Sequence, residues 1–82
     1  MNDGLRLQLA LGALLAALSG CRGIEVVDDV ILGAGAKVLC ARGVLHIGRG
    51  TLLGANAVLL ESTGENEIWA GLPARKVGQR DA

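Results

Sequence analysis

A six-residue period runs through the middle of this 82-residue chain and restricts what it can fold into. Branched aliphatic residues return every six positions between residues 26 and 60, with one longer interval, and a small or β-branched residue follows four positions after most of them. The aliphatic positions are Val26, Leu32, Val38, Ile47, Leu53 and Leu59, and the small positions are Val30, Ala36, Thr51 and Ala57. Because a short fixed period is the signature of a repeat architecture, the sequence predicts a stack of similar turns.

Each turn of such a stack has three short flat sides, and each side takes six residues. The aliphatic residue that opens a hexad points into a narrow core, where neighbouring turns place their equivalents about 4.8 Å apart. Gly and Asn between the hexads permit the tight corners. The period therefore predicts an all-β left-handed parallel β-helix over residues 23–60. Left-handed crossovers are rare between parallel strands and occur where a strict repeat imposes them.

One interval departs from the period. Val38 and Ile47 are nine positions apart, so three extra residues lie between them, within residues 40–44. We expect these residues to leave the stack as a loop. Excursions of this kind often belong to a binding site, and they are as often a tolerated insertion at the surface.

The first 22 residues have a different character. The chain from Leu5 to Leu18 is nearly all Leu and Ala, and it is shorter than the roughly 20 apolar residues that a membrane-spanning helix needs. We expect a short apolar helix that caps the open end of the stack. The alternative is a lipoprotein signal, because Leu-Ser-Gly-Cys ending at Cys21 looks like a bacterial lipobox. A lipidated Cys21 would anchor the protein to a membrane, but Asp3 beside a single Arg6 gives the leading segment little positive charge.

The composition narrows the classes of function. There is no Phe or Tyr and only one Trp in a chain that is 51% hydrophobic, so the core is aliphatic. Eight basic and eight acidic residues cancel without forming a basic run, so we expect no nucleic-acid partner. Cys21 and Cys40 lie far apart and lack a Cys-x-x-Cys pattern. We expect two small buried or half-buried thiols, with neither a disulfide scaffold nor a metal site.

Three segments together resemble a known family. Val30 to Leu39, Ile47 to Leu59 and the Ala-Gly-Leu-Pro-Ala-Arg run of the tail, 61–82, look like the carboxyl-terminal part of serine O-acetyltransferases, which are hexapeptide-repeat acyltransferases. The resemblance covers roughly residues 23–78. It implies transfer of an acetyl group from acetyl-CoA to the hydroxyl of serine, a step of cysteine biosynthesis, by a homotrimer. CoA is a cytosolic metabolite, so it also implies a cytoplasmic protein.

The resemblance assigns roles to particular residues. It places Gly35, Ala36, Lys37 and Ala55 along the CoA groove between neighbouring subunits, and Arg75 and Lys76 opposite the CoA phosphates. Arginine suits that task because its planar fork forms paired hydrogen bonds to phosphate oxygens. The alternative for the two basic residues is solvated surface charge.

The general base of the family is a His in upstream coils that this chain does not contain, and Gly23 stands where a second family His lies. His46 is the single histidine, and because it precedes the core residue Ile47 it should point outward beside the extra residues. We consider it as a base or as a plain surface residue. A zinc enzyme of the carbonic anhydrase type needs three His ligands, and this chain has one histidine.

Six core positions make only about two coils, so we expect an incomplete chain, the tail of a longer enzyme, that associates with copies of itself. Two other functions remain open. One is a non-catalytic trimerising or CoA-binding module that kept the scaffold without the base. The other is an acetyltransferase that acts on a sugar or another small hydroxyl substrate.

Overall fold

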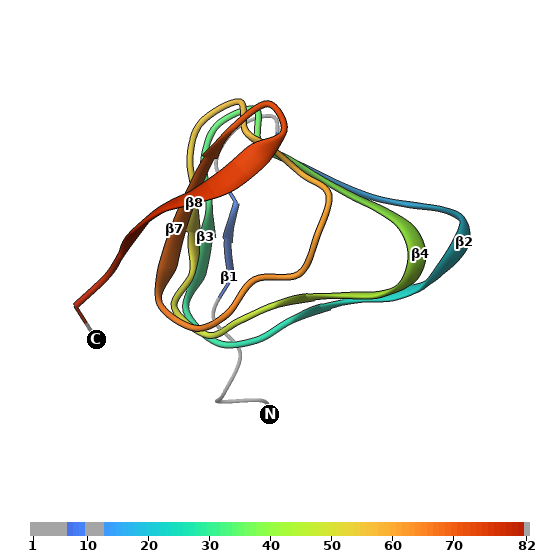
Figure 1. The fold of residues 1–82 in the computed structure, drawn as a ribbon, viewed down its shortest axis with the longest axis horizontal. Helices are drawn as coiled ribbons and strands as arrows, with labels where there is room; N and C mark the ends of the chain where they lie inside the picture. Colours follow the sequence, from blue (N-terminus) through green and yellow to red (C-terminus); the bar gives the residue numbers. More distant parts are fainter. Residues whose placement is uncertain (1–6, 10–12, 82) are drawn as a thin grey trace.

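The computed structural model describes residues 7–9 and 13–81, and this part of the chain is all-β (Figure 1). The strands are β1 (Leu7–Leu9), β2 (Leu14–Val26), β3 (Val30–Leu32), β4 (Lys37–Ile47), β5 (Leu52–Leu53), β6 (Val58–Leu59), β7 (Glu67–Gly71) and β8 (Ala74–Gln79). Seen along the stack, the chain traces a triangular outline again and again (Figure 1).

Successive turns of the chain pair in parallel. The first turn consists of β1 and β2, the second of β3 and β4, and the third of β5 and β6 with the residues up to Asn66. One sheet has the order β1-β3-β5-β7-β8 and the other β2-β4-β6, so each strand lies beside its equivalent in the next turn. Only the last pair, β7 with β8, is antiparallel, and this hairpin ends the stack. The predicted stack of similar turns is confirmed.

The six-residue period located the core. The buried members of the pattern are Val30, Leu32, Ala36, Val38, Ile47, Thr51, Leu53, Ala57 and Leu59, each no more than 1% exposed. Val26, in the first turn, is half-buried. Side chains alternate across a strand, so Val30 and Leu32 point inward while Ile31 between them stays half-exposed.

The predicted role of Gly and Asn at the corners is confirmed. Gly35 has a φ of 71° and Asn56, in the next turn, has a φ of 60°. These left-handed conformations are open to Gly and to the short polar Asn. The backbone N–H of Asn56 donates to the carbonyl of Ala34 at 2.8 Å, so equivalent corners stack directly on each other.

The expected loop between Val38 and Ile47 is wrong in one respect. The extra residues do extend one corner of the triangle, here called the wide corner (residues 40–45), but they remain in the continuous strand β4. They stay paired because the first turn bulges at the same place. β2 pairs with β4 from Leu14 opposite Lys37 onward, with two register shifts. Two stacked bulges satisfy each other's backbone groups, which an unpaired loop would leave to solvent.

The expected apolar helix is also wrong for the residues that the structure describes. Leu7–Leu9 and the residues from Leu14 on are strands, while residues 1–6 and 10–12 lie outside the described part. The hexad period continues upstream, since Leu9 pairs with Leu32 and Leu15 pairs with Val38. A run of Leu and Ala hides this period, and packing on the second turn overrides the helical preference of these residues. No helix in the described ranges is long and apolar enough to cross a membrane.

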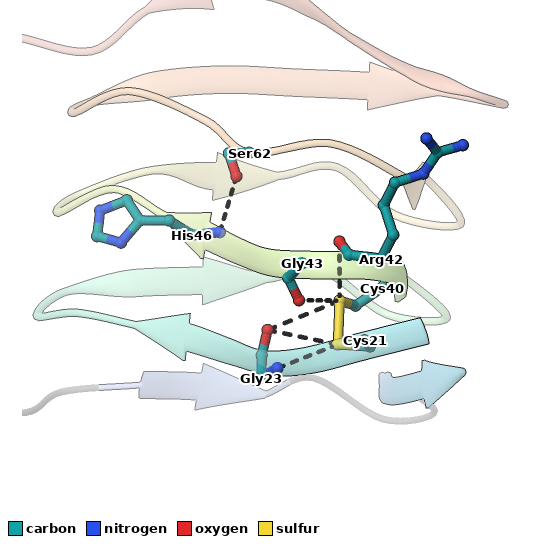
Figure 2. The surroundings of a disulfide bond; sticks show 7 residues. All are labelled: Cys21, Gly23, Cys40, Arg42, Gly43, His46 and Ser62. Carbon is teal, nitrogen blue, oxygen red and sulfur yellow. Dashed lines mark hydrogen bonds between the residues drawn. A yellow bond between two sulfur atoms is a disulfide. The ribbon is translucent and has the colours of Figure 1, made fainter. Parts of the chain in front are cut away.

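The two cysteines form a disulfide, which corrects the expectation of free thiols (Figure 2). Cys21 of β2 and Cys40 of β4 are 19 positions apart, but stacking of the two bulges brings their Cα atoms to 5.4 Å. That separation lies in the usual range for a disulfide. The expected burial is right, since Cys40 is buried and Cys21 is half-buried. The bond ties the wide corner of the second turn to the first.

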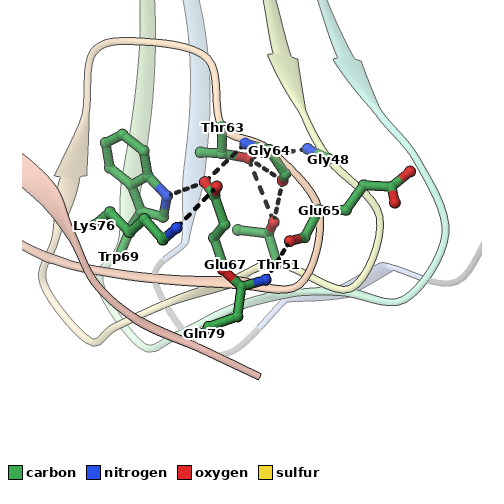
Figure 3. Close-up of polar contacts among 9 residues, drawn as sticks. All are labelled: Gly48, Thr51, Thr63, Gly64, Glu65, Glu67, Trp69, Lys76 and Gln79. Atoms are coloured by element: carbon green, nitrogen blue, oxygen red, sulfur yellow. Dashed lines mark hydrogen bonds and ion pairs between the residues drawn. The ribbon is translucent and has the colours of Figure 1, made fainter. Parts of the chain in front are cut away.

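A cluster of polar side chains lies where the third turn meets the terminal hairpin (Figure 3). Glu67 accepts hydrogen bonds from the Trp69 indole at 2.9 Å and from the backbone N–H of Gly64 at 2.8 Å. Lys76 lies 3.5 Å from the same carboxylate. These donors, the indole foremost, lower the pKa of Glu67 although partial burial acts in the opposite direction. A charged group can therefore help to fasten the hairpin to the stack.

Candidate functional site

The structure brings four of the predicted CoA-groove residues together on one corner. Gly35, Ala36 and Lys37 lie at the turn between β3 and β4, and Ala55 lies at the equivalent turn between β5 and β6. The backbone N–H of Lys37 donates to the carbonyl of Ala57 at 2.8 Å, which holds the two turns side by side. We call this surface the glycine corner (residues 33–37 and 54–57). It lies at a different vertex of the triangle from the wide corner (Figure 1).

These residues differ in what they offer a ligand. Ala36 is fully buried, its N–H donates to Gly33 and its carbonyl accepts from Leu14, so it supports the corner from inside. Ala55 and Lys37 are exposed. The Lys37 ammonium donates to the carbonyl of Gly35 at 3.1 Å, which holds a positive charge over the corner. Small residues below and a cation above form a low surface that an anionic chain can approach.

The terminal hairpin extends this surface by one level. The N–H of Gly54 donates to the carbonyl of Trp69 at 2.8 Å, so β7 continues directly from the glycine corner. Arg75 pairs with Ala70 across the hairpin and is exposed, with no ion-pair partner among the described residues. Lys76 already lies near the carboxylate of Glu67. Of the two basic residues predicted for phosphate, Arg75 is the one whose charge is unmatched.

His46 lies on a different side of the triangle from the glycine corner. Its ring is half-exposed, as predicted, and Nδ1 lies 3.2 Å from Oε1 of Glu25 in the neighbouring turn. Its backbone N–H donates to the Ser62 hydroxyl at 2.9 Å (Figure 2). Gly23, at the place of the second family His, is half-buried near the disulfide. The structure therefore brings no imidazole to the glycine corner within the described residues.

The described residues contain no cluster of three or more His, Cys, Asp or Glu side chains that could hold a metal ion.

A pocket lies beside the wide corner, at the nine-residue interval for which the sequence left a binding site and a tolerated insertion open. The third turn takes a short route there, since β6 ends at Leu59 and Thr63 already donates its N–H to the carbonyl of His46. A cavity of about 290 Å³ opens between the long second turn and the short third turn, and we call it the step pocket. Its lining residues are Cys40, Ala41, Arg42, Val44, Leu45, Leu60, Glu61 and Ser62. The nine-residue interval between Val38 and Ile47 indicated this place, whereas the shorter route of the third turn, which opens the pocket, was not predicted.

Comparisons with known proteins agree on one kind of relative. The chain is 40% identical over 63 residues to the serine acetyltransferase of Escherichia coli K12, and 42% identical over 64 residues to that of Haemophilus influenzae Rd. These alignments cover 77% and 78% of this chain but only 22% and 23% of the relatives. The chain thus spans about a fifth of the length of the curated relatives it matches. No model of a known protein family matches it.

Solved structures give the same result. A serine acetyltransferase of Brucella abortus S19 in complex with coenzyme A superposes with a TM-score of 0.81 at 29% identity, over 94% of this chain and 31% of that one. A serine acetyltransferase in complex with cysteine superposes with a TM-score of 0.64 at 28% identity, over 88% of this chain and 38% of that one.

In sequence and in fold, this chain is therefore similar to part of a hexapeptide-repeat transferase. The relatives and solved structures that it matches are serine acetyltransferases, which confirms the resemblance predicted from the hexads and the Ala-Gly-Leu-Pro-Ala-Arg run.

Proposed function

We propose that this chain forms the CoA-binding coils of a serine O-acetyltransferase, which transfers the acetyl group of acetyl-CoA to the hydroxyl of L-serine. The observation that carries the proposal is the alignment of the glycine corner with Arg75 along one vertex of the stack. Its likeness to a structure that holds coenzyme A supports it. We further propose that the coils wind left-handed and that the working assembly is a trimer with the CoA groove between subunits.

The residues at the glycine corner suit the chemistry of CoA. Gly35 and the exposed Ala55 keep the surface low, so an extended pantetheine arm can lie close to the backbone. Gly35 has a φ of 71°, at which a larger residue would be strained, and its Cβ would also meet the side chain of Asn56. Lys37 offers a point charge and Arg75 a planar fork to the phosphates. These contacts bind and orient the thioester, and the reaction itself also requires a base that removes the serine proton.

Binding and turnover should separate in this chain, because the glycine corner is present and no described imidazole lies beside it. Calorimetric titration with CoA tests the binding. Arg75→Ala should weaken affinity by roughly 1.5–3 kcal/mol if the phosphate contacts are well shielded, and by less in proportion to exposure. Arg49→Ala removes another exposed cation, between β4 and β5, and is the matched control. Equal affinities for the two variants would contradict the assigned role of Arg75.

Release of free thiol from acetyl-CoA, followed with and without serine, tests the turnover. Loss of a positioned base typically removes about 10²–10⁴-fold of rate, so the chain should fall well below ordinary enzyme rates of roughly 1–10³ s⁻¹. An ordinary rate would show that a base is present. His46→Gln would then be the first variant to examine, because Glu25 holds that ring in place.

A non-catalytic CoA-binding or trimerising module is the second candidate. The observation that favours it is Gly23, which occupies the place of a family His. CoA binding without any serine-dependent thiol release would support this candidate, and thiol release with a sugar in place of serine would support a different acceptor.

We also propose a cytoplasmic location, where acetyl-CoA is available. The lipoprotein alternative would require cleavage before Cys21, which removes β1 and the first half of β2, where Leu14 to Gly20 pair with β4. It would also require the sulfur that is bonded to Cys40. Disulfides are uncommon in the cytosol, so whether Cys21 and Cys40 are bonded in cells bears on the proposed location. Labelling with a radioactive fatty acid decides the question, since incorporation that Cys21→Ser abolishes would establish a lipid anchor.

A further inference from the structure

The step pocket lies at an open strand edge. β4 pairs with β6 only at Lys37 and Val58 and at Val38 and Leu59. Backbone contact with the third turn resumes at His46. Between these points, on the side of the third turn, β4 has no strand partner in the described part of the chain. The backbone of β4 therefore lacks a strand partner along the stretch whose residues line the pocket.

The walls of the pocket are apolar and its rim is charged. Leu45 is buried at the back, whereas Val44 and Leu60 are 45% and 54% exposed. Arg42 extends from the second turn toward the level of the third (Figure 2), and Glu61 belongs to the third turn. Among the described residues, neither of these charges takes part in an ion pair. The pocket thus presents one free cation and one free anion beside an aliphatic wall.

We propose that the step pocket binds a free α-amino acid with a branched aliphatic side chain, such as leucine. Arg42 meets the carboxylate, Glu61 meets the ammonium group, and the side chain packs against Val44, Leu45 and Leu60. The disulfide fixes the Cys40 wall, so the pocket exists before the ligand arrives. This site is separate from the glycine corner and goes beyond acetyl transfer.

Size and shape exclude larger ligands. A volume of about 290 Å³ lies at the small end of the range for ligand sites, which suits an amino acid better than a nucleotide. An added peptide strand would have to run along β4, but the third turn blocks that path at both ends, at Leu59 and at Ser62. The pocket is also open, so we expect weak binding with Kd near the millimolar range.

Titration of the isotopically labelled full chain by NMR tests the proposal, because it detects weak binding residue by residue. The probes are L-leucine, 4-methylpentanoate, which lacks the ammonium group, and 3-methylbutylamine, which lacks the carboxylate. L-leucine should shift the amides of Arg42 and Ser62 and bind more tightly than either analogue. Equal affinity for all three probes, or shifts confined to the glycine corner, would overturn the proposal, and this comparison needs no variant.

Two variants then assign the charges. Arg42→Gln should weaken the binding of L-leucine by up to about fivefold, the size expected of an exposed ion pair. It should leave the affinity for 3-methylbutylamine unchanged, because that probe has no carboxylate. Glu61→Gln should weaken the binding of L-leucine and leave the affinity for 4-methylpentanoate unchanged, because that probe has no ammonium group. The matched controls, Arg49→Gln and Glu65→Gln, change the same charges elsewhere on the surface and should have no effect. If both variants lost the binding of all three probes, the pocket would be damaged and the pairing of Arg42 with the carboxylate and Glu61 with the ammonium group would be contradicted. If L-serine bound at the step pocket as tightly as L-leucine, the proposed packing of the ligand side chain against the aliphatic wall would be contradicted.

Discussion

Gly48 shows how closely neighbouring turns approach. A Cβ at this position would overlap the carbonyl of Gly64 in the next turn, which is backbone and cannot swing away. Gly54 occupies the equivalent place one hexad later, where a Cβ would only touch the Ala70 side chain at 3.4 Å. We expect Gly48→Ala to destabilise the chain by about 1–3 kcal/mol, as overpacking does, and Gly54→Ala to have little effect. Urea denaturation of the two variants measures the difference, and equal losses would contradict the spacing of the turns.

Glu67 makes the stability of the hairpin depend on pH. Its hydrogen bonds lower its pKa in the folded state, so its contribution is complete above the ordinary carboxyl pKa and disappears as the pH falls through the lowered value. Glu67→Gln keeps the size of the side chain and loses the charge. The variant should melt below the parent chain at neutral pH, and the two melting temperatures should converge in acid. Thermal unfolding from neutral pH to about pH 2 tests this, with exposed Glu65→Gln as control, and a constant difference would exclude the charge as its cause.

At the scale of residues, the sequence predicted the inward positions well and the polar contacts poorly. A period fixes which side chains share a face, so Leu32, Val38 and their equivalents could be assigned without a structure. Glu67 and Trp69 are neighbours in space because the hairpin folds back, and no periodicity encodes that return. The pairing of the cysteines likewise depends on register between turns, which spacing along one turn cannot supply.

Among the elements, the stacked bulges of β2 and β4 hold the most specific feature of the fold. The Cys21–Cys40 bond closes a loop of about twenty residues, for which the chain-entropy model gives roughly 3 kcal/mol of stabilisation. We expect a reducing agent to lower the melting temperature of the parent chain and to leave the Cys21→Ser/Cys40→Ser variant unchanged. Thermal unfolding with and without reductant compares the two. If the reductant did not change the melting temperature of the parent chain, the bond would not form in solution.

The same elements show what sequence patterns leave out. The nine-residue interval correctly indicated a departure from the period between Val38 and Ile47, but an interval does not reveal whether the extra residues are paired. The matching bulge in β2 was hidden because the Leu- and Ala-rich run before it satisfies a helical and a hexad pattern equally, and the bulge itself falls on the Leu-Ser-Gly-Cys segment that resembles a lipobox. A more varied sequence upstream would have allowed the register between the first and second turns to be predicted.

For the whole molecule, the two ends of the stack differ. At one end the terminal hairpin covers β5, and the two-residue strand β6 is the outer strand of its sheet. At the other end the outer strand of that sheet is the 13-residue β2, which pairs with β4 on one side only among the described strands. Leu15, Ile24 and Val26 of the first turn are only partly buried against the core. An unpaired strand edge beside apolar side chains favours association. This arrangement agrees with the proposal of a homo-oligomer and limits how stable a single copy can be.

We therefore expect the purified chain to have a mass above the 8.4 kDa of one copy in size-exclusion chromatography with light scattering, and to dissociate on dilution. Leu18 on β2 is 55% exposed, and a charge on an open edge opposes pairing, so Leu18→Lys should shift the equilibrium toward the monomer. Leu72→Lys, at the 77% exposed tip of the hairpin, adds the same charge away from the β2 edge and should leave the mass unchanged. If the parent chain were a monomer that melts cooperatively at every concentration, the open edge would not be an interface, because the first turn would then be stable without a partner.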